Sequence, residues 1–409
     1  MSSLSGARLV AIVCAAQVLA QIGAYFWPAL LPTMIPLWGL TNSEAGWITG
    51  IFYAAYLVSV PVLVTLTDRI DAKRVYLFGV ACTVIAHVLF GLYAEGFWTA
   101  LATRALAGMG WAGTYMTGLK LLADRVDSTL MARAVSGHAA GVGVSGALSF
   151  SCAGLLADAY GWPAAFIIAG LSAALAWLFV WFSVPRRART DKAATGAPLF
   201  DFRPVLRNRS AMAYSIGYCI HTLEMNALRG WGVAFLGFVA ASAGAGVVHP
   251  ALSPTAVLTG LGLLGTLASV LGNEAAIRLG RRRLIGFAML ASATVAAAIG
   301  FIGTLSYEMA VALLLLYGFI VWLDSSSLTA GSAGTADPAR RGATLAIHSM
   351  LGYAGGFVGP LMIGVILDLS GGMSRAGWRA SFLAIGALML AAFVVFLAMR
   401  PRVLAGDRQ

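Results

Sequence analysis

The chain has 409 residues, of which 60% are hydrophobic and only 11% are charged, and its mean hydropathy is +0.85. Soluble domains carry charged side chains at about a quarter of their positions, so this composition excludes a soluble protein. The formal net charge of +11 does not indicate a nucleic-acid partner, because the basic residues are concentrated in short connections between long apolar runs.

Apolar runs follow one another along the chain, each long enough to cross about 30 Å of hydrocarbon as a helix. A backbone in lipid must satisfy its own hydrogen bonds, and the runs do not alternate as barrel strands do. The sequence therefore predicts an all-α integral membrane protein with twelve transmembrane helices, at 9–37, 44–67, 75–94, 97–122, 131–157, 162–184, 210–239, 253–279, 284–304, 307–329, 341–367 and 378–399.

Basic residues mark one side of these predicted helices. Most of the 27 lysines and arginines precede span 1, follow span 12, or lie in a central linker and in the connections after spans 2, 4, 8 and 10. An excess of positive charge identifies the cytoplasmic side. We therefore predict a multi-pass protein of the cell (inner) membrane with both termini in the cytoplasm. The first run continues past the length of a signal peptide, so cleavage is not expected.

The chain divides near its midpoint at a basic, proline-containing stretch. We predict an N-terminal six-helix bundle over 1–184, a cytoplasmic linker over 185–209 and a C-terminal six-helix bundle over 210–409. The halves also share residues at a constant offset (348 − 138 = 210): His138, Gly154 and Asp158 recur as His348, Gly364 and Asp368. Half-chain repeats are typical of secondary transporters, which bind substrate between the repeats.

The connection between spans 2 and 3 reads D-R-x-x-x-K-R. Together with the twelve spans, the linker and the repeat, it resembles the major facilitator superfamily, whose loop reads G-x-x-x-D-R-x-G-x-[RK]-[RK]. The two glycine positions hold valine and aspartate here, and the second-half copy has Ile277 in place of the acid. The resemblance implies two pseudo-symmetric bundles (the MFS fold) and a cytoplasmic gating loop. In this sequence that loop would consist of Asp68, Arg69, Lys73 and Arg74.

The resemblance also implies that helices 1, 4, 7 and 10 line a central cavity. Ionisable groups inside a bilayer are functional candidates because their burial is costly. An arginine above aromatic rings suits an organic carboxylate, although it could equally bond backbone carbonyls of helices 1 and 2. Uncharged polar residues one turn apart suit either substrate recognition or interhelical bonding. The predicted substrate-binding residues are Gln17, Gln21, Tyr25, Arg104, Trp111, Tyr115 and Arg229.

Span 7 is the most informative helix. His221 and Glu224 are spaced i, i+3 and so lie on one face, where an imidazole and a carboxyl could load and unload a proton. We predict that this pair couples transport to protons; the alternative is a polar cluster that joins helices 7 and 11. Asp324 in span 10 lies on one face with Tyr317, and we expect it to act in gating by pairing with a basic loop residue.

These features predict a secondary active transporter, not an enzyme. The chain contains no phosphate-binding GxxxxGK[ST], HExxH or CxxC motif, and no cofactor is expected. The preferred hypothesis is proton-coupled uptake of a small organic anion by alternating access. The partners would be that solute, protons and the lipid bilayer, and a monomer suffices for this architecture.

Two alternative functions remain open. Aromatic residues in the predicted cavity fit proton-driven efflux of drugs or metabolites, whereas the absence of a Gly-Pro pair from span 5 does not, because the drug exporters of the family carry that pair there. Copper import is the other alternative, since a thiol, an imidazole and a thioether occur together in span 7. Its candidate ligands are Cys219, His221 and Met225.

Overall fold

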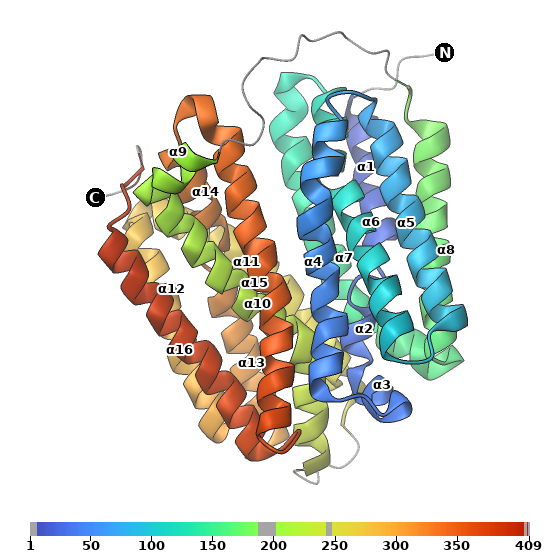
Figure 1. Cartoon of the computed structure of the whole chain (residues 1–409), viewed down its shortest axis with the longest axis vertical. Coiled ribbons are helices and arrows are strands. Elements are labelled where there is room, and N and C mark those ends of the chain that lie inside the picture. Colours follow the sequence, from blue (N-terminus) through green and yellow to red (C-terminus); the bar gives the residue numbers. More distant parts are fainter. Residues whose placement is uncertain (1–5, 187–201, 243–247, 405–406, 408–409) are drawn as a thin grey trace. The chain divides into compact units, whose positions relative to one another are not determined.

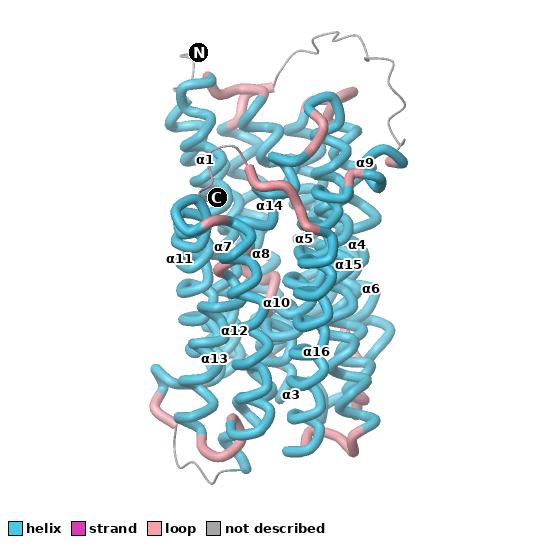
Figure 2. Tube along the Cα trace, turned by 90° about the vertical axis from the view of Figure 1, so that its left-hand side faces the viewer, coloured by secondary structure: helices cyan, strands magenta, loops and turns pink. Residues whose placement is uncertain are grey.

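The computed structural model describes residues 6–186, 202–242, 248–404 and 407, and every regular element in these ranges is a helix (Figures 1 and 2). The all-α prediction is therefore confirmed. Most of the predicted linker lies outside the described residues, so the domain limits at 184 and 210 stay a prediction.

The described residues divide into two compact units, 1–40 with 51–194 and 41–50 with 195–409. The helices of the first half are α1 Gly6–Gln21, α2 Phe26–Ala29, α3 Leu31–Trp38, α4 Asn42–Leu66, α5 Ala72–Tyr93, α6 Phe97–Ala123, α7 Ser128–Tyr160 and α8 Trp162–Ser183. Those of the second half are α9 Arg203–Arg207, α10 Arg209–Ser242, α11 Pro254–Leu279, α12 Arg281–Ile302, α13 Tyr307–Trp322, α14 Ser325–Thr335, α15 Arg341–Leu369 and α16 Arg375–Met399, with short 3₁₀ turns at Pro250–Leu252 and Pro338–Arg340.

Nine helices among the described residues are long and apolar enough to cross a membrane, taking α13 and α14 together. Helix α1 is apolar but shorter. Helices α6 and α10 are long but carry the polar residues that the sequence singles out, including Arg104 and Glu224. A multi-pass membrane protein follows from the nine, whereas the count of twelve spans stays a prediction.

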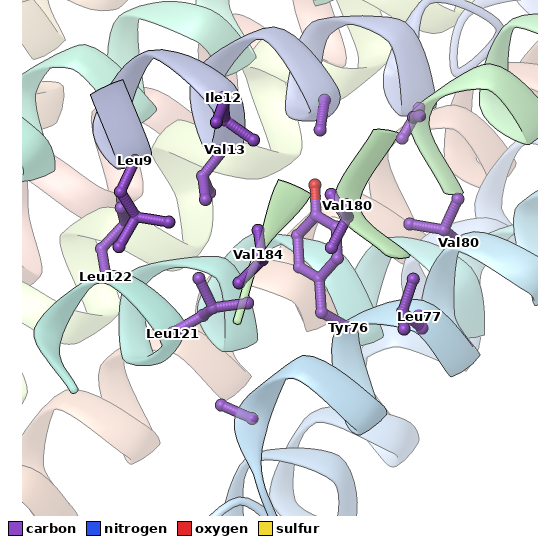
Figure 3. Packing of buried hydrophobic residues seen from close by; sticks show 14 of the residues in the cluster. Leu9, Ile12, Val13, Tyr76, Leu77, Val80, Leu121, Leu122, Val180 and Val184 are labelled. Carbon is purple, nitrogen blue, oxygen red and sulfur yellow. The ribbon is translucent and has the colours of Figure 1, made fainter. Parts of the chain in front are cut away.

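The core of unit 1 joins α1, α5, α6 and α8 through interdigitating aliphatic side chains around Tyr76 (Figure 3). Helices α5 and α6 approach closely because Gly79 and Gly113 face each other, and a Cβ on either would meet the other's backbone. Small residues permit such close helix contacts in membranes, where burial of apolar surface gives little drive for association. Gly108 allows the same approach of α6 to the backbone of Phe52 in α4.

Unit 2 uses the same device between α10 and α15. Gly352, Gly355 and Gly359 recur along one face of α15. A Cβ at Gly355 or Gly359 would collide with a backbone carbonyl of α10, and one at Gly352 would collide with the ring of Tyr218. Because the backbones of α10 and α15 are in close contact, the polar face of α10 packs directly against its neighbouring helices.

Two predicted spans are interrupted. The first consists of α1, α2 and α3, because the chain turns at 22–25 and again at Leu30. The tenth is divided at Leu323 and Asp324, between α13 and α14. Discontinuous membrane helices expose backbone groups at mid-depth, where transporters commonly bind solutes and ions. Both breaks adjoin the polar clusters described next.

Residues 41–50, the first turns of α4, belong to unit 2. The carboxylate of Asp368, near the end of α15, accepts hydrogen bonds from the backbone N–H groups of Asn42 and Ser43, at 3.0 and 2.7 Å. It also accepts bonds from both of their side chains. An anion at the start of a helix satisfies N–H groups that lack partners within the helix. Asp368, singled out by the repeat, therefore caps α4.

Candidate functional site

The predicted gating loop connects α4 to α5 in unit 1. Asp68, Arg69 and Arg74 are exposed there, while Lys73 is buried and its Nζ donates to the carbonyls of Trp181 and Val184. The acid that forms the ion pair in this loop is Asp71. Its carboxylate accepts from the Lys73 backbone N–H at the start of α5 and pairs with Arg125. Lys73 therefore binds backbone carbonyls of α8 and of the residue after it, and the gating role of the loop stays a prediction.

The break after α1 borders a small buried pocket in unit 1, called here the unit-1 pocket. It has room for a group of about the size of one water molecule. Polar atoms of Gln21, His87 and Trp111 reach it without a hydrogen-bond partner among the described residues. The pocket is lined by Ala20, Gln21, Ala24, Phe52, Thr83, His87, Ala107 and Trp111.

The hydrogen-bonding character of these groups follows from their neighbours. The Thr114 hydroxyl bonds to carbonyls of its own helix, so its oxygen is left to accept from Gln21 Nε2, at 3.1 Å. Gln21 Oε1 is then a free acceptor. His87 Nδ1 lies 2.9 Å from the Thr83 carbonyl, which can only accept, so Nδ1 carries a proton there. The Trp111 Nε1–H is a donor.

Arg104 lies beside this pocket, with only 3% of its surface exposed. Its Nη1 donates to the carbonyl of Ala24 in the helix break, at 3.1 Å, and its guanidinium lies 4.7 Å from the ring centre of Phe52. Nε has no partner within the described ranges. One nitrogen of Arg104 therefore bonds a backbone carbonyl, which is the structural alternative given above. The remaining N–H groups are also donors, so the hypothesis that Arg104 binds a substrate carboxylate stays open.

The other predicted substrate residues of unit 1 separate into two groups. Tyr25 stacks on Phe150, with ring centres 5.3 Å apart, and meets Trp111 edge-on. Gln17 instead accepts a bond from Tyr76 within the apolar core. Tyr115 stacks on His138, and its carbonyl lies 2.9 Å from that ring. The structure therefore brings Gln21, Tyr25, Arg104 and Trp111 together, but not Gln17 or Tyr115.

Glu224 is the centre of a second cluster, inside unit 2. Its side chain is fully buried, and Oε1 accepts a 2.6 Å bond from the Tyr317 hydroxyl and a second bond from Ser292. Oε2 has no partner among the residues described. The ionisable side chains near this carboxyl are those of His221 and Asp324. We call Glu224, His221, Asp324, Ser292 and Tyr317 the unit-2 acid cluster.

Within this cluster, Nδ1 of His221 lies 2.9 Å from Oδ1 of Asp324. This is an ion-pair distance, although the two groups are not aligned for a hydrogen bond. Asp324 is only 2% exposed and stands at the break before α14. It therefore meets an imidazole inside the bundle, where the sequence led us to expect a basic residue of a loop.

Arg229 and Cys219, two other predicted residues of unit 2, have neighbours of their own. Arg229 is half-buried, and its guanidinium lies 4.8 Å from the ring centre of Trp322. The backbone carbonyl of Cys219 lies so close to Gly355 that a Cβ at that position would collide with it. No group of three or more His, Cys, Asp or Glu side chains is placed to hold a metal ion within the described part of the chain.

Comparison with known families fits this architecture. The family model described as "Major Facilitator Superfamily" matches residues 13–323, which is most of the chain. The chain belongs to the major facilitator superfamily. It is thus related to transporters that bind small molecules and sit in membranes, and not to enzymes. The resemblance drawn from the loop and the repeat is confirmed.

Several superfamily members are similar over nearly the whole chain. Protein spinster homolog 1 is 27% identical in Bos taurus and 26% identical in Homo sapiens, with 96% and 95% of this chain and 79% and 78% of those proteins covered. A bacterial homolog of the human lysosomal transporter Spinster, in an inward-facing and occupied conformation, has the same fold, with a TM-score of 0.80, 16% identity and 98% of each chain covered. The nucleoside transporter NupG follows with a TM-score of 0.76, 14% identity and coverage of 96% and 99%.

Sequence reasoning missed several residues of the candidate site and of the loop before α5. His87 carried a usable signal, because an ionisable residue in the middle of an apolar span is a functional candidate. Asp71 was also detectable, since an aspartate directly before a helix is a common N-cap. Ser292 carried no signal, because a lone serine in an apolar helix has many uses. Its role depends on the contact between α10 and α12.

Proposed function

We propose that this protein couples the uptake of a small organic anion to protons and moves the anion by alternating access. The observation that carries the proposal is the buried Glu224 carboxyl. One oxygen has two hydroxyl donors, and the other has no hydrogen-bond partner in the described part of the chain. An isolated ionised carboxylate in such a place is costly, and a protonated one is not. A carboxyl in this setting can therefore carry a proton across the membrane.

The surroundings of Glu224 suit both states of the carboxyl. When it is ionised, the hydroxyls of Tyr317 and Ser292 donate to Oε1. When it is protonated, Oε2 can hold the proton without breaking either bond. His221 and Asp324, adjacent in the cluster, form a second acid–imidazole pair that can balance a change of charge nearby.

Recognition of the anion is assigned to unit 1. Arg104 offers N–H groups beyond the one bound to Ala24, and Phe52 and Trp111 supply an aromatic floor. A planar guanidinium binds carboxylates through paired hydrogen bonds, which gives both affinity and orientation. Arg229, above the ring of Trp322 in unit 2, is a second candidate for contact with the anion. The gating role stays with Asp68, Arg69, Lys73 and Arg74.

The location follows from the distribution of charge. We place the protein in the inner or plasma membrane, with both termini in the cytoplasm, because basic residues gather on the side of the termini and the linker. A monomer is sufficient, since both polar clusters are built within a single chain.

Efflux of amphipathic solutes is the second candidate. The aromatic group formed by Tyr25, Phe52, Trp111 and Phe150 favours it, because flat apolar solutes pack well on such rings. Copper import gains less support, since Asp324 lies against Nδ1 of its candidate ligand His221. The direction of flux distinguishes uptake from efflux.

The test uses purified protein in liposomes with an acidic exterior and an alkaline lumen. A panel of radiolabelled mono- and dicarboxylates is offered outside, and the unaltered protein is compared with Glu224→Gln. We expect at least one carboxylate to accumulate, and Glu224→Gln to abolish that accumulation. Glu274→Gln is the matched control, because Glu274 is an exposed carboxyl paired with Arg278 on the same helix. Accumulation that ignores the pH gradient would refute proton coupling.

A further inference from the structure

The segment after α16 docks on one end of unit 2, where α9 and α14 also lie (Figure 1). The Arg402 backbone N–H donates to Ser210 Oγ at 3.0 Å, and its carbonyl accepts from the Tyr214 hydroxyl at 3.0 Å. Ser210 and Tyr214 belong to the first turns of α10, and both are buried. These bonds hold the backbone of the segment and do not depend on its side chains.

A buried ion pair adds specificity for an acidic side chain. Asp407 receives two bonds from Arg281, from Nε to Oδ2 at 2.8 Å and from Nη2 to Oδ1 at 3.0 Å. The side chains are only 4% and 3% exposed. Paired, parallel N–H···O bonds of this kind are the preferred geometry between arginine and a carboxylate. Because the pair is buried, the loss of either partner leaves an uncompensated charge.

The same arginine also bonds the elements around the helix break. Its Nη1 donates to Asn273 Oδ1 of α11, at 3.1 Å, and to the Ser327 carbonyl in the first turn of α14, at 3.3 Å. Leu404 packs against α14 at Gly334, where a Cβ would collide with the leucine side chain. The segment after α16 therefore contacts α14 twice, directly through Leu404 and indirectly through Arg281.

We propose that this surface is a recognition site for a peptide segment that presents one carboxylate, that residues 400–404 and Asp407 of the chain occupy it, and that its occupancy fixes the break between α13 and α14. We call it the tail site, formed by Ser210, Tyr214, Asn273, Arg281, Ser327 and Gly334. The break contains Asp324, three residues before Ser327, so release of the segment loosens the helix that positions the unit-2 acid cluster. The second copy of the basic loop has Ile277 where the first copy has an acid. Asp407, from the distant segment after α16, supplies an acid to this loop.

A neighbouring pair provides an internal reference. Glu274 and Arg278 are one turn apart on α11, with side chains 56% and 74% exposed. Exposed pairs of this kind contribute little because water screens them and both side chains lose freedom. The structure thus offers one buried and one exposed acid–arginine pair in the same unit, and only the buried one should control α14.

The experiment is amide hydrogen exchange of the purified full-length protein, read by mass spectrometry over residues 328–335. Asp407→Asn should speed exchange of these amides by about tenfold, because the neutral amide cannot compensate Arg281. Asp407→Glu, which keeps the charge, should restore much of the protection. Glu274→Gln should exchange at the unaltered rate. Equal exchange in Asp407→Asn and the unaltered protein would overturn the proposal.

A second measurement tests recognition itself. A synthetic peptide of residues 400–409 is added to the Asp407→Asn protein, and the same peptide with asparagine at position 407 is added in parallel. The peptide with aspartate at position 407 should restore the protection of α14, and the peptide with asparagine there should not. If both act alike, or neither acts, the site does not recognise the carboxylate of this segment. Neither measurement uses a solute or a pH gradient, so its result is independent of the proposed transport function.

Discussion

The two units bury different chemistry at their interrupted helices. The unit-1 pocket combines an amide, an indole and the His87 imidazole, with Arg104 beside it, whereas the unit-2 acid cluster combines two carboxyls with an imidazole and two hydroxyls. No carboxyl is among the described residues that line the unit-1 pocket. A guanidinium stays charged at any physiological pH, while carboxyls and imidazoles exchange protons. Under the proposed function, this difference corresponds to a division of roles, with one unit recognising the solute and the other exchanging the proton. The following predictions test this division, beginning with the largest effect.

Glu224→Gln should separate transport from proton coupling. The amide can keep bonds with Tyr317 and Ser292 but cannot release a proton, so accumulation driven by a pH gradient should fall to that of protein-free liposomes. Exchange of labelled for unlabelled solute at equal pH should continue, because it requires no net movement of protons. Both assays are made on the same proteoliposomes. Loss of exchange as well would show that Glu224 serves more than coupling.

Arg104→Lys should impair recognition and leave coupling intact. The lysine keeps the charge but loses the flat guanidinium that lies over Phe52 and bonds Ala24. We expect the apparent KM for the solute to rise by about tenfold, a loss of about 1.4 kcal/mol. The maximal rate should change little. Initial uptake rates over a range of solute concentrations provide the measurement. A fall in maximal rate at unchanged KM would contradict a role in recognition.

Tyr317→Phe should weaken unit 2 without abolishing transport. It removes one of the two donors to Glu224 Oε1, and Ser292 remains. A hydrogen bond of this kind contributes about 1 to 3 kcal/mol to the free energy of unfolding. Thermal unfolding in detergent should therefore shift to lower temperature, while accumulation persists. The matched control is Tyr307→Phe, whose hydroxyl bonds the Leu252 carbonyl away from the cluster. That change should lower stability without affecting the pH dependence of uptake.

Gln17→Leu should have the smallest effect. Gln17 receives a long 3.3 Å bond from Tyr76, and its Nε2 has no partner among the described residues. Loss of the bond and relief of an unsatisfied buried group should nearly cancel, so we expect stability to change by less than about 1 kcal/mol. Uptake kinetics should be unaltered. A large rise in KM would return Gln17 to the substrate-binding residues.

Sequence reasoning worked best where the chemistry is local. The fold class followed from hydrophobic length, because a membrane permits few backbone solutions. The adjacency of His221 and Glu224 followed from their i, i+3 spacing on one helix. In contrast, the predicted substrate residues of unit 1 do not all lie together: Gln17 and Tyr115 are apart from Gln21, Tyr25, Arg104 and Trp111, and their roles stay a prediction. Helix 1 breaks after Gln21, so a single helical period does not describe it.

The sequence by itself determined that this protein crosses the membrane many times, is built from two related halves and carries an acid–imidazole pair within a helix. Only the tertiary structure decided which partners those groups meet. Ser292 and Tyr317 reach Glu224 across separations of 68 and 93 residues, and Asp407 reaches Arg281 across 126. Such contacts depend on how helices pack and where they break. Helix packing and helix breaks depend on the whole bundle, so no periodic pattern within a single segment predicts them.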